Sequence, residues 1–122
     1  MISKHDKIDY LEFPSRDLAA SKTFFSAVFG WTFTDYGSDY TAFSDAGIDG
    51  GFYAADLASS SANGSALVVF YSDNLDATQR NIEAAGGLIV KPIFSFPGGQ
   101  RFHFTEPAGN EFAVWSNNLA DE

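Results

Sequence analysis

The stretch Glu106-Pro107-Ala108-Gly109-Asn110-Glu111-Phe112-Ala113-Val114-Trp115 combines a turn with a strand. Its proline fixes one backbone angle, while its glycine and asparagine tolerate a positive φ, so this segment predicts a chain reversal. After the turn, Phe112 and Val114 fall on one face of the strand and their neighbours fall on the other. Residues 100–105 alternate in the same way before the turn. We therefore predict a β-hairpin with one face in the core and the other lining a site.

Composition places the chain among ordinary globular proteins. It has 122 residues, of which 45% are hydrophobic and 13 are phenylalanine, which suits one compact domain over residues 1–122 with an aromatic core. There is no run of about 18 apolar residues, so we expect no membrane partner. Residues 1–7 lack the apolar segment of a secretory signal, and we expect a cytoplasmic protein.

Charge and cysteine content exclude further classes. The net charge of −9 would repel phosphate backbones, so we expect no nucleic-acid partner. Such a charge chiefly serves solubility, and attraction of a cationic ligand is the alternative. The chain has no cysteine, which removes disulfides, thiolate nucleophiles and thiolate metal ligands.

Two successive series of strand and helix patterns follow each other along the chain. The first predicts a strand at 7–13, a helix at 17–29, and strands at 31–36, 40–44 and 50–55. Residues 57–65 are small and polar and predict a linker. The second series predicts a strand at 66–71, a helix at 74–85, and strands at 88–91, 100–105 and 111–115. Asp17 and Asn74 are suited to N-cap the two helices.

The two series align as an internal repeat. A shift of 57 residues superposes Asp17 on Asn74, and a shift of about 60 superposes Phe52 on Phe112 and Tyr53 on Ala113 in the last strands. We therefore predict an α+β fold of two βαβββ modules in tandem, at about 6–56 and 66–116. Each helix covers one face of its sheet, and the two sheets form a curved mixed sheet around a cavity.

The cavity should be lined by the side chains that point away from the helices. Hydroxyls and carboxylates among them favour a ligand site over a dry core, because unpaired buried polar groups are costly; the alternative is that these side chains simply fill the space. Tyrosine and tryptophan can stack on a flat ligand. The predicted lining residues are Tyr10, Glu12, Tyr53, Leu67, Val69, Tyr71, Glu111, Ala113 and Trp115.

Short motifs along nearly the whole chain, from about residue 6 to 116, resemble those of the vicinal oxygen chelate superfamily. They are Glu12-Phe13-Pro14, Arg16-Asp17-Leu18, Phe24-Phe25, Val28-Phe29-Gly30-Trp31, Asp73-Asn74-Leu75, Ala84-Ala85-Gly86-Gly87 and Glu106-Pro107-Ala108-Gly109-Asn110-Glu111. That group includes glyoxalase I, extradiol dioxygenases, fosfomycin-modifying enzymes, methylmalonyl-CoA epimerase and the bleomycin resistance proteins. The resemblance implies the paired-module fold, and many relatives of this size form homodimers. One such scaffold hosts many activities, so the resemblance specifies no reaction.

The resemblance also implies a metal site to look for. Metal-dependent members hold a divalent ion with His or Gln on the first strand, His on the first strand of the second half, and Glu on the last strand of each half. Those positions correspond here to Tyr10, Leu67 and Ala113, with the fourth near Tyr53. Leucine and alanine cannot bind a metal, and a phenol with a reference pKa near 10 is a poor ligand. We expect no metal ligands and no cofactor; a divalent metal held by other residues is the alternative.

Three residues are candidate catalytic groups. His103 can act as a general base or a hydrogen-bond donor, or else pack as a sheet histidine. Glu12 and Glu111 can form an acid–base pair across the cavity, or instead pair with Arg16, Lys91 or Arg101 at its rim. Arg101 and His103 complete the predicted ligand-binding set.

One segment is expected to be mobile. Residues 94–96 are suited to a flexible lid over the cavity entrance, and Gly98-Gly99 to a turn leading into the hairpin.

Three functions remain open at this point. The first is a metal-free, homodimeric binding protein for a small organic molecule. The second is a divalent-metal-dependent lyase, isomerase or dioxygenase. The third is a mainly structural dimer or regulatory subunit with a filled cavity.

Overall fold

A computed structural model describes residues 4–117 and confirms the predicted fold class. The first module comprises β1 (Tyr10–Ser15), α1 (Leu18–Phe29), β2 (Thr32–Asp35), β3 (Tyr40–Ser44) and β4 (Asp49–Ala54). A 3₁₀ turn, η1 (Ser61–Asn63), lies in the linker. The second module comprises β5 (Val68–Tyr71), α2 (Leu75–Ala84), β6 (Leu88–Phe96), β7 (Gly99–Thr105) and β8 (Glu111–Ser116).

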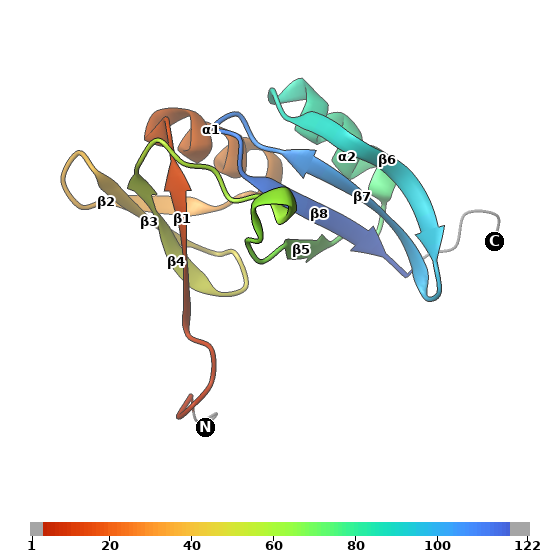
Figure 1. The fold of residues 1–122 in the computed structure, drawn as a ribbon, viewed down its shortest axis with the longest axis horizontal. Coiled ribbons are helices and arrows are strands. Elements are labelled where there is room, and N and C mark those ends of the chain that lie inside the picture. Colours follow the sequence, from red (N-terminus) through yellow and green to blue (C-terminus); the bar gives the residue numbers. More distant parts are fainter. Residues whose placement is uncertain (1–3, 118–122) are drawn as a thin grey trace.

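The two modules form two mixed four-stranded sheets with the same topology. The strand orders are β1-β4-β3-β2 and β5-β8-β7-β6, and in each sheet the first and last strands of the module pair in parallel. Figure 1 shows the sheets side by side, with both helices along one side of the molecule. The predicted hairpin is formed by β7 and β8, which pair antiparallel from Gln100↔Ser116 to Thr105↔Glu111.

Both helices begin where the sequence predicts. The Asp17 side chain accepts a hydrogen bond from the Ala20 amide, and the Asn74 side chain accepts one from the Ala77 amide, each at 3.1 Å. These bonds satisfy amides that have no partner within the helix. Gly30 ends α1 with a φ of 72°, which is a left-handed conformation that glycine adopts without strain. Local capping chemistry therefore sets the helix boundaries.

Two predicted strands differ from the structure by more than two residues at one end, and the others differ by no more than two. β1 starts at Tyr10 and continues through Pro14, which an edge strand tolerates because proline needs no ladder donor on its free side. β6 runs on to Phe96 and pairs with β7 up to Phe96↔Gly99. The prediction of a flexible lid at residues 94–96 is therefore wrong, because ladder hydrogen bonds hold this segment. The register shifts around Lys91 obscured the strand in the sequence.

The register of the parallel strands corrects the repeat alignment. Leu11 pairs with Gly50 in the first sheet, and its repeat partner Val68 pairs with Phe112 in the second. The last strands are therefore related by a shift of 62 residues rather than about 60, which superposes Gly51 on Ala113. Of the five residues by which the shift grows from 57 to 62, the β6–β7 hairpin supplies four and the β7–β8 turn supplies one. Because the observed and the predicted shift of the last strands differ by an even number of residues, every side chain of these strands keeps its predicted face.

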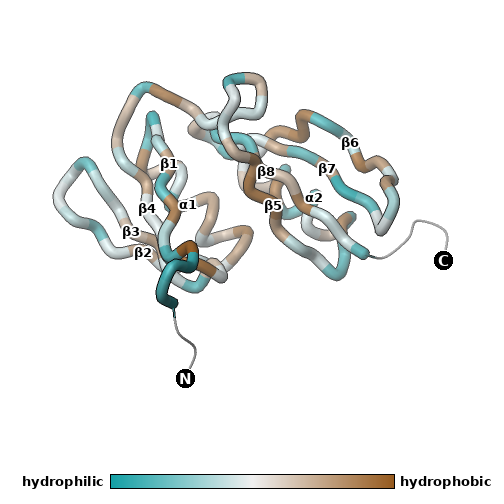
Figure 2. The backbone as a smooth tube through the Cα atoms, turned by 60° about the horizontal axis from the view of Figure 1, so that its bottom comes forward, coloured by the Kyte–Doolittle hydropathy of each residue, from teal (hydrophilic) through white to brown (hydrophobic). Residues whose placement is uncertain are grey.

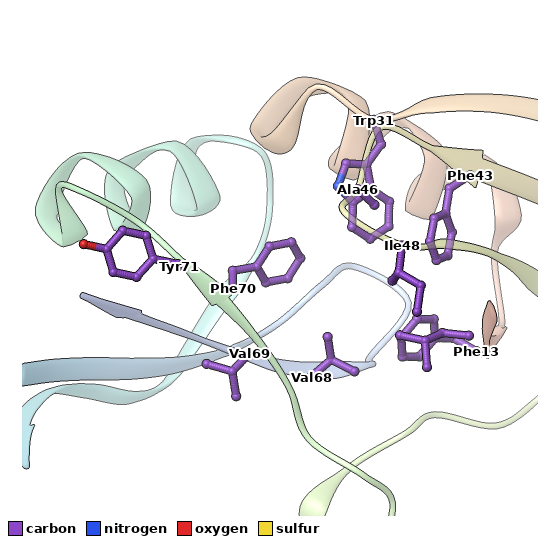
Figure 3. A pocket seen from close by; sticks show the side chains of 10 residues that line it. Phe13, Trp31, Phe43, Ala46, Ile48, Val68, Val69, Phe70 and Tyr71 are labelled. Atoms are coloured by element: carbon purple, nitrogen blue, oxygen red, sulfur yellow. The ribbon is translucent and has the colours of Figure 1, made fainter. Parts of the chain in front are cut away.

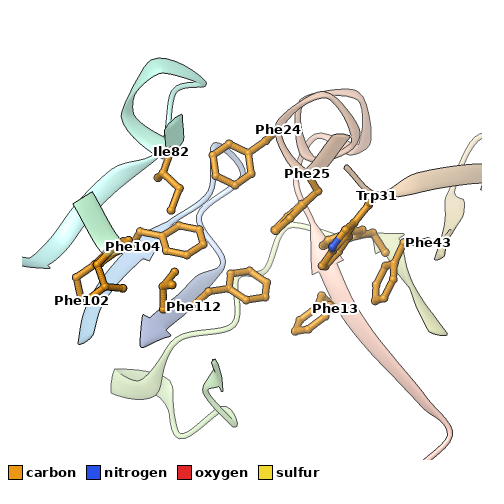
Figure 4. Packing of buried hydrophobic residues seen from close by; sticks show 12 residues of the cluster. Phe13, Phe24, Phe25, Trp31, Phe43, Ile82, Phe102, Phe104 and Phe112 are labelled. Carbon is orange, nitrogen blue, oxygen red and sulfur yellow. The ribbon is translucent and has the colours of Figure 1, made fainter. Parts of the chain in front are cut away.

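An aromatic core joins the modules. Phe25 of α1 lies 5.6 Å from Phe52 in the first sheet and 5.3 Å from Phe112 in the second, measured between ring centroids. Phe13 and Phe112 contact each other directly across the boundary at 5.2 Å. Figure 4 shows these rings as one continuous cluster between the two modules. Burial of such large rings is the main force holding the two sheets together.

A buried polar cluster reinforces this junction. The Glu106 carboxylate, in the β7–β8 turn, accepts hydrogen bonds from the Ser21 hydroxyl of α1, the Ala108 amide and the Asn110 side chain. The Asn110 amide also donates to the Pro14 carbonyl of β1 at 2.7 Å. The segment that suggested a turn in the sequence therefore also ties the second module to the first.

Hydropathy along the chain follows these layers. Figure 2 shows that the described residues before β1 are mostly hydrophilic, with Ile8 as the exception, whereas hydrophobic residues gather mainly on the strands and helices. Within residues 4–117, no helix is long and apolar enough to span a membrane.

Candidate functional site

Each sheet leaves one face uncovered by its helix, and the open face of the second sheet carries two ordered rows of side chains. Cross-strand pairing places Phe94, Arg101, Trp115 and Tyr71 in one row from β6 to β5. The adjacent row contains Lys91, His103, Ala113 and Val69. Paired side chains on one face lie about 5 Å apart, so each row forms a continuous surface. The first row is mainly aromatic and the second is partly basic.

His103 lies between the Arg101 guanidinium and the Glu111 carboxylate on this face. Its Nδ1 atom is 3.4 Å from Glu111 Oε2, and its Nε2 atom accepts a hydrogen bond from Arg101 Nε at 3.2 Å. The His103 and Glu111 side chains are only 13% and 12% exposed. Both ring nitrogens of His103 are therefore engaged, so it can serve as a general base only if Arg101 moves. The arrangement suits orientation and binding better than proton transfer.

The linker holds Glu111 in place. The Ser61 amide and hydroxyl of η1 both donate to Glu111 Oε1, at 2.7 and 2.9 Å, and the Glu111 amide donates to the Ser59 carbonyl. A shallow groove runs between η1 and β6–β8 and is lined by Val90, Lys91, His103, Thr105 and Glu111 among others. The segment predicted as a plain linker therefore forms one wall of the candidate site.

The charges of this cluster follow from its surroundings. Burial lowers the pKa of His103, nearby Arg101 and Lys91 act in the same direction, and Glu111 opposes them. For Glu111, burial acts to raise the pKa, but hydrogen bonds from Ser61 and His103 outweigh it and lower the pKa. At neutral pH the histidine is therefore neutral and the carboxylate is ionised.

The open face of the first sheet carries a separate hydrogen-bonded group. The Tyr40 hydroxyl donates to Glu12 Oε2 at 2.8 Å and lies 2.6 Å from the Tyr10 hydroxyl. Burial and these two neighbours raise the pKa of Tyr40 well above its ordinary value, so it remains protonated. The Tyr40 ring crosses Gly51, where any Cβ would collide with its hydroxyl. A glycine is therefore required beneath this tyrosine.

An apolar cleft of about 330 Å³ opens between the modules. Figure 3 shows Phe13, Trp31, Phe43, Ala46 and Ile48 on the side of the first module, facing β5 of the second. Apart from the Tyr71 hydroxyl and the Trp31 ring nitrogen, its lining side chains are apolar, so this cleft offers few groups for catalysis.

The predicted site residues fall into two groups rather than one ring. Tyr10, Glu12 and Tyr53 lie on the open face of the first sheet, with Tyr10 and Tyr53 44% and 38% exposed. The other predicted residues belong to the second module: Val69, Tyr71, Arg101, His103, Glu111, Ala113 and Trp115 lie on its open face, and Leu67 just precedes β5. Glu12 and Glu111 do not pair with each other, because each is hydrogen-bonded within its own group.

Four residues of these groups were not among the predicted site residues: Tyr40, Ser61, Lys91 and Phe94. Tyr40 could have been found from its alternation with Phe43 in the predicted third strand. Lys91 and Phe94 depend on the irregular register of β6, for which the sequence gives no signal. Ser61 lies in the linker, 50 residues before Glu111, so no local pattern in the sequence predicts their contact.

The side chains do not fit the metal site that the resemblance implies. With the corrected register, the four positions are Tyr10, Gly51, Leu67 and Ala113, and the Tyr40 ring fills the space above the glycine. Three of these residues have no donor atom in their side chains. In the part of the chain that the structure describes, no three His, Asp or Glu side chains are grouped so as to hold an ion elsewhere. The side chains at these four positions therefore do not form the family's metal site.

Comparison with known proteins agrees with this architecture. The genomically encoded fosfomycin resistance protein FosX from Listeria monocytogenes superposes with a TM-score of 0.75 at 19% identity, covering 98% of this chain and 97% of that one. At this identity the similarity shows the fold alone.

Two curated relatives are closer in sequence. The anthracycline biosynthesis protein DnrV of Streptomyces peucetius is 32% identical, and DauV of Streptomyces sp. (strain C5) is 30% identical; each alignment covers 92% of this chain. The chain spans about half the length of these relatives, 47% of each. A family model described as Glyoxalase/Bleomycin resistance protein/Dioxygenase superfamily matches residues 7–114. The chain therefore belongs to the glyoxalase/bleomycin resistance protein/dioxygenase superfamily.

Proposed function

We propose that this protein binds a small, planar aromatic molecule on the open face of its second sheet, without a divalent metal. The observation that carries the proposal is the row Phe94, Arg101, Trp115 and Tyr71, in which aromatic rings flank a guanidinium on one sheet face. Trp115 lies 5.1 Å from Tyr71 at an interplanar angle of 73° and 6.2 Å from Phe96 at 54°, so the rings contact one another and form a connected, uneven aromatic wall rather than a flat stack. A flat ligand can stack on one of these rings while the others contact its edge.

The names of the relatives support the choice of ligand. DnrV and DauV are named for anthracycline biosynthesis, and the fused planar rings of an anthracycline could pack against these aromatic side chains. A thermal-shift screen of hydroxyanthraquinones and smaller fused-ring compounds tests this, because a ligand that binds only the folded state raises the Tm. Saturated analogues of similar size serve as controls. The proposal fails if the planar and saturated compounds shift the Tm equally, or if neither does.

Metal analysis separates this proposal from the alternative of a metal-dependent lyase, isomerase or dioxygenase. We expect protein purified without chelators to contain much less than one divalent ion per chain, because the family's ligand positions hold Tyr10, Gly51, Leu67 and Ala113. Stoichiometric metal that is retained through gel filtration would favour the enzyme.

We also propose that two copies of the chain associate. Strands β1 and β5 are edge strands, and Tyr10, Val69 and Tyr71 on them are between 40% and 47% exposed. The relatives contain further sequence of about the same length as this chain, which a second copy could replace. Light scattering during gel filtration should give twice the chain mass of 13.2 kDa, and a monomer at all concentrations would contradict the proposal.

A further inference from the structure

We propose that the bound molecule carries an anionic group, a carboxylate or ionised phenol, which Lys91 and Arg101 hold beside the Phe94 ring. This inference rests on the proposed function and adds the charge class of the ligand. It concerns the two cations on the open face of the second sheet and the aromatic ring between them.

The two cations converge on a single ring. Lys91 Nζ lies 4.5 Å from the Phe94 ring centroid, and the Arg101 guanidinium lies 6.0 Å from it. His103 lies 5.9 Å from the same ring. The chain has only seven Lys and Arg residues and a net charge of −9, so a pair of cations around one apolar ring departs from the general charge of the molecule. Two cations beside one apolar ring create a locally positive surface that favours an anion.

Among the residues that the structure describes, no carboxylate supplies that anion by direct pairing. Within residues 4–117, Lys91 and Arg101 form no ion pair, whereas Arg16 pairs with Asp56 at 2.9 Å and Lys22 with Asp35 at 3.0 Å. The nearest acid in the cluster, Glu111, accepts two hydrogen bonds from Ser61 and lies beside His103. Glu111 is therefore hydrogen-bonded to Ser61 and His103 rather than paired with either cation.

Arg101 is held in a suitable orientation. Its Nε atom donates to His103 Nε2, which leaves the two terminal nitrogens without a hydrogen bond in the described part of the chain. Those terminal nitrogens can donate together to two oxygens of one carboxylate. Trp115, directly opposite Arg101 on β8, and Phe94, opposite it on β6, then contact the flat body of the same ligand. An aromatic carboxylate fits this arrangement of charge and rings.

The experiment compares 2-naphthoate with 2-naphthamide, which have the same shape and differ in charge. By isothermal titration calorimetry at low ionic strength, we expect 2-naphthoate to bind roughly tenfold more tightly, with the difference shrinking at high salt. Arg101→Gln and Lys91→Gln should each weaken naphthoate binding by roughly fivefold and leave naphthamide nearly unchanged. Arg80→Gln, on the exposed surface of α2, is the matched control and should change neither.

A second measurement reports where the anionic group of the ligand binds. The pKa of His103, followed through its ring proton by NMR, should rise when naphthoate binds, because an anion offsets the nearby cations. Equal affinity for the two probes would overturn the charge assignment and leave the proposed function standing. Equal effects of all three Gln variants would also overturn it. Failure of both probes to bind would overturn the inference together with the proposed function.

Discussion

At the scale of single residues, the open faces owe their shape to a few positions where one side chain determines another. Gly51 is the clearest, because the Tyr40 ring occupies the space that any larger residue would need. Tyr40 in turn brings its hydroxyl to Glu12 and Tyr10. The sequence indicated only that glycines in this strand allow a close approach. It could not identify the approaching ring, because the contact spans two strands.

Gly51→Ala should destabilise the protein by about 1–3 kcal/mol, because the added methyl group displaces Tyr40 and breaks its bond to Glu12. Urea unfolding measures the loss. In a Tyr40→Ala background the same substitution should cost less, since the opposing ring is gone and only the Thr41 carbonyl oxygen, 2.9 Å from the added methyl group, still crowds it. An equal cost in both backgrounds would contradict this packing.

Glu106 predicts a pH dependence of stability. Burial raises its pKa, and hydrogen bonds from Ala108, Asn110 and Ser21 only partly oppose this. The folded protein therefore binds the proton more tightly than the unfolded chain, so the stabilisation is complete below the ordinary carboxyl pKa and is lost as pH rises through the raised value. The unfolding free energy of the natural protein, measured relative to Glu106→Gln, should fall as the pH rises above the ordinary carboxyl pKa. A pH-independent difference would refute the assignment.

At the scale of elements, the sequence was most informative where a local interaction determines where a helix or strand begins or ends. The caps at Asp17 and Asn74, the stop at Gly30 and the β7–β8 hairpin all depend on residues within a few positions of one another. Strand β6 was predicted too short because its register shifts follow from its pairing with β7, not from its own pattern. The same limit kept Lys91 and Phe94 out of the predicted site.

Asp17→Ala removes the acceptor at the start of α1 and should cost about 1 kcal/mol of stability. Because α1 carries Phe25 between the two sheets, the loss should appear in global unfolding rather than as local fraying. Asp39→Ala, an exposed acid in the β2–β3 turn, is the control and should change stability by less than about 0.5 kcal/mol. Equal effects of the two changes would show that capping is unimportant here.

At the scale of the whole molecule, the repeat predicted the architecture correctly but not the arrangement of the site. Two modules, two sheets and one covered face on each followed from periodicity alone. The structure then separated the predicted lining into a tyrosine group around Glu12 and a basic group around His103. How such groups meet depends on packing between the modules, which no local pattern encodes.

Asn110 tests how strongly the modules are coupled. Its side chain bonds to Ser59 in the linker, Pro14 in β1 and Glu106 in the hairpin turn. Asn110→Ala leaves buried partners unsatisfied and should cost about 2–4 kcal/mol while both modules still unfold together. Asn63→Ala, on the exposed surface of η1, should be nearly neutral. Two separate unfolding transitions in the natural protein would contradict the coupling.

The most direct test of the account is an NMR titration of ¹⁵N-labelled, chelator-treated protein with 2-naphthoate. We predict saturable shifts of the side-chain N–H signals of Trp115 and Arg101 with no metal present, and no further change when a divalent ion is added. Shifts that appear only after a metal is supplied, or that leave the second sheet unaffected, would contradict the claim that this sheet binds its ligand without an ion.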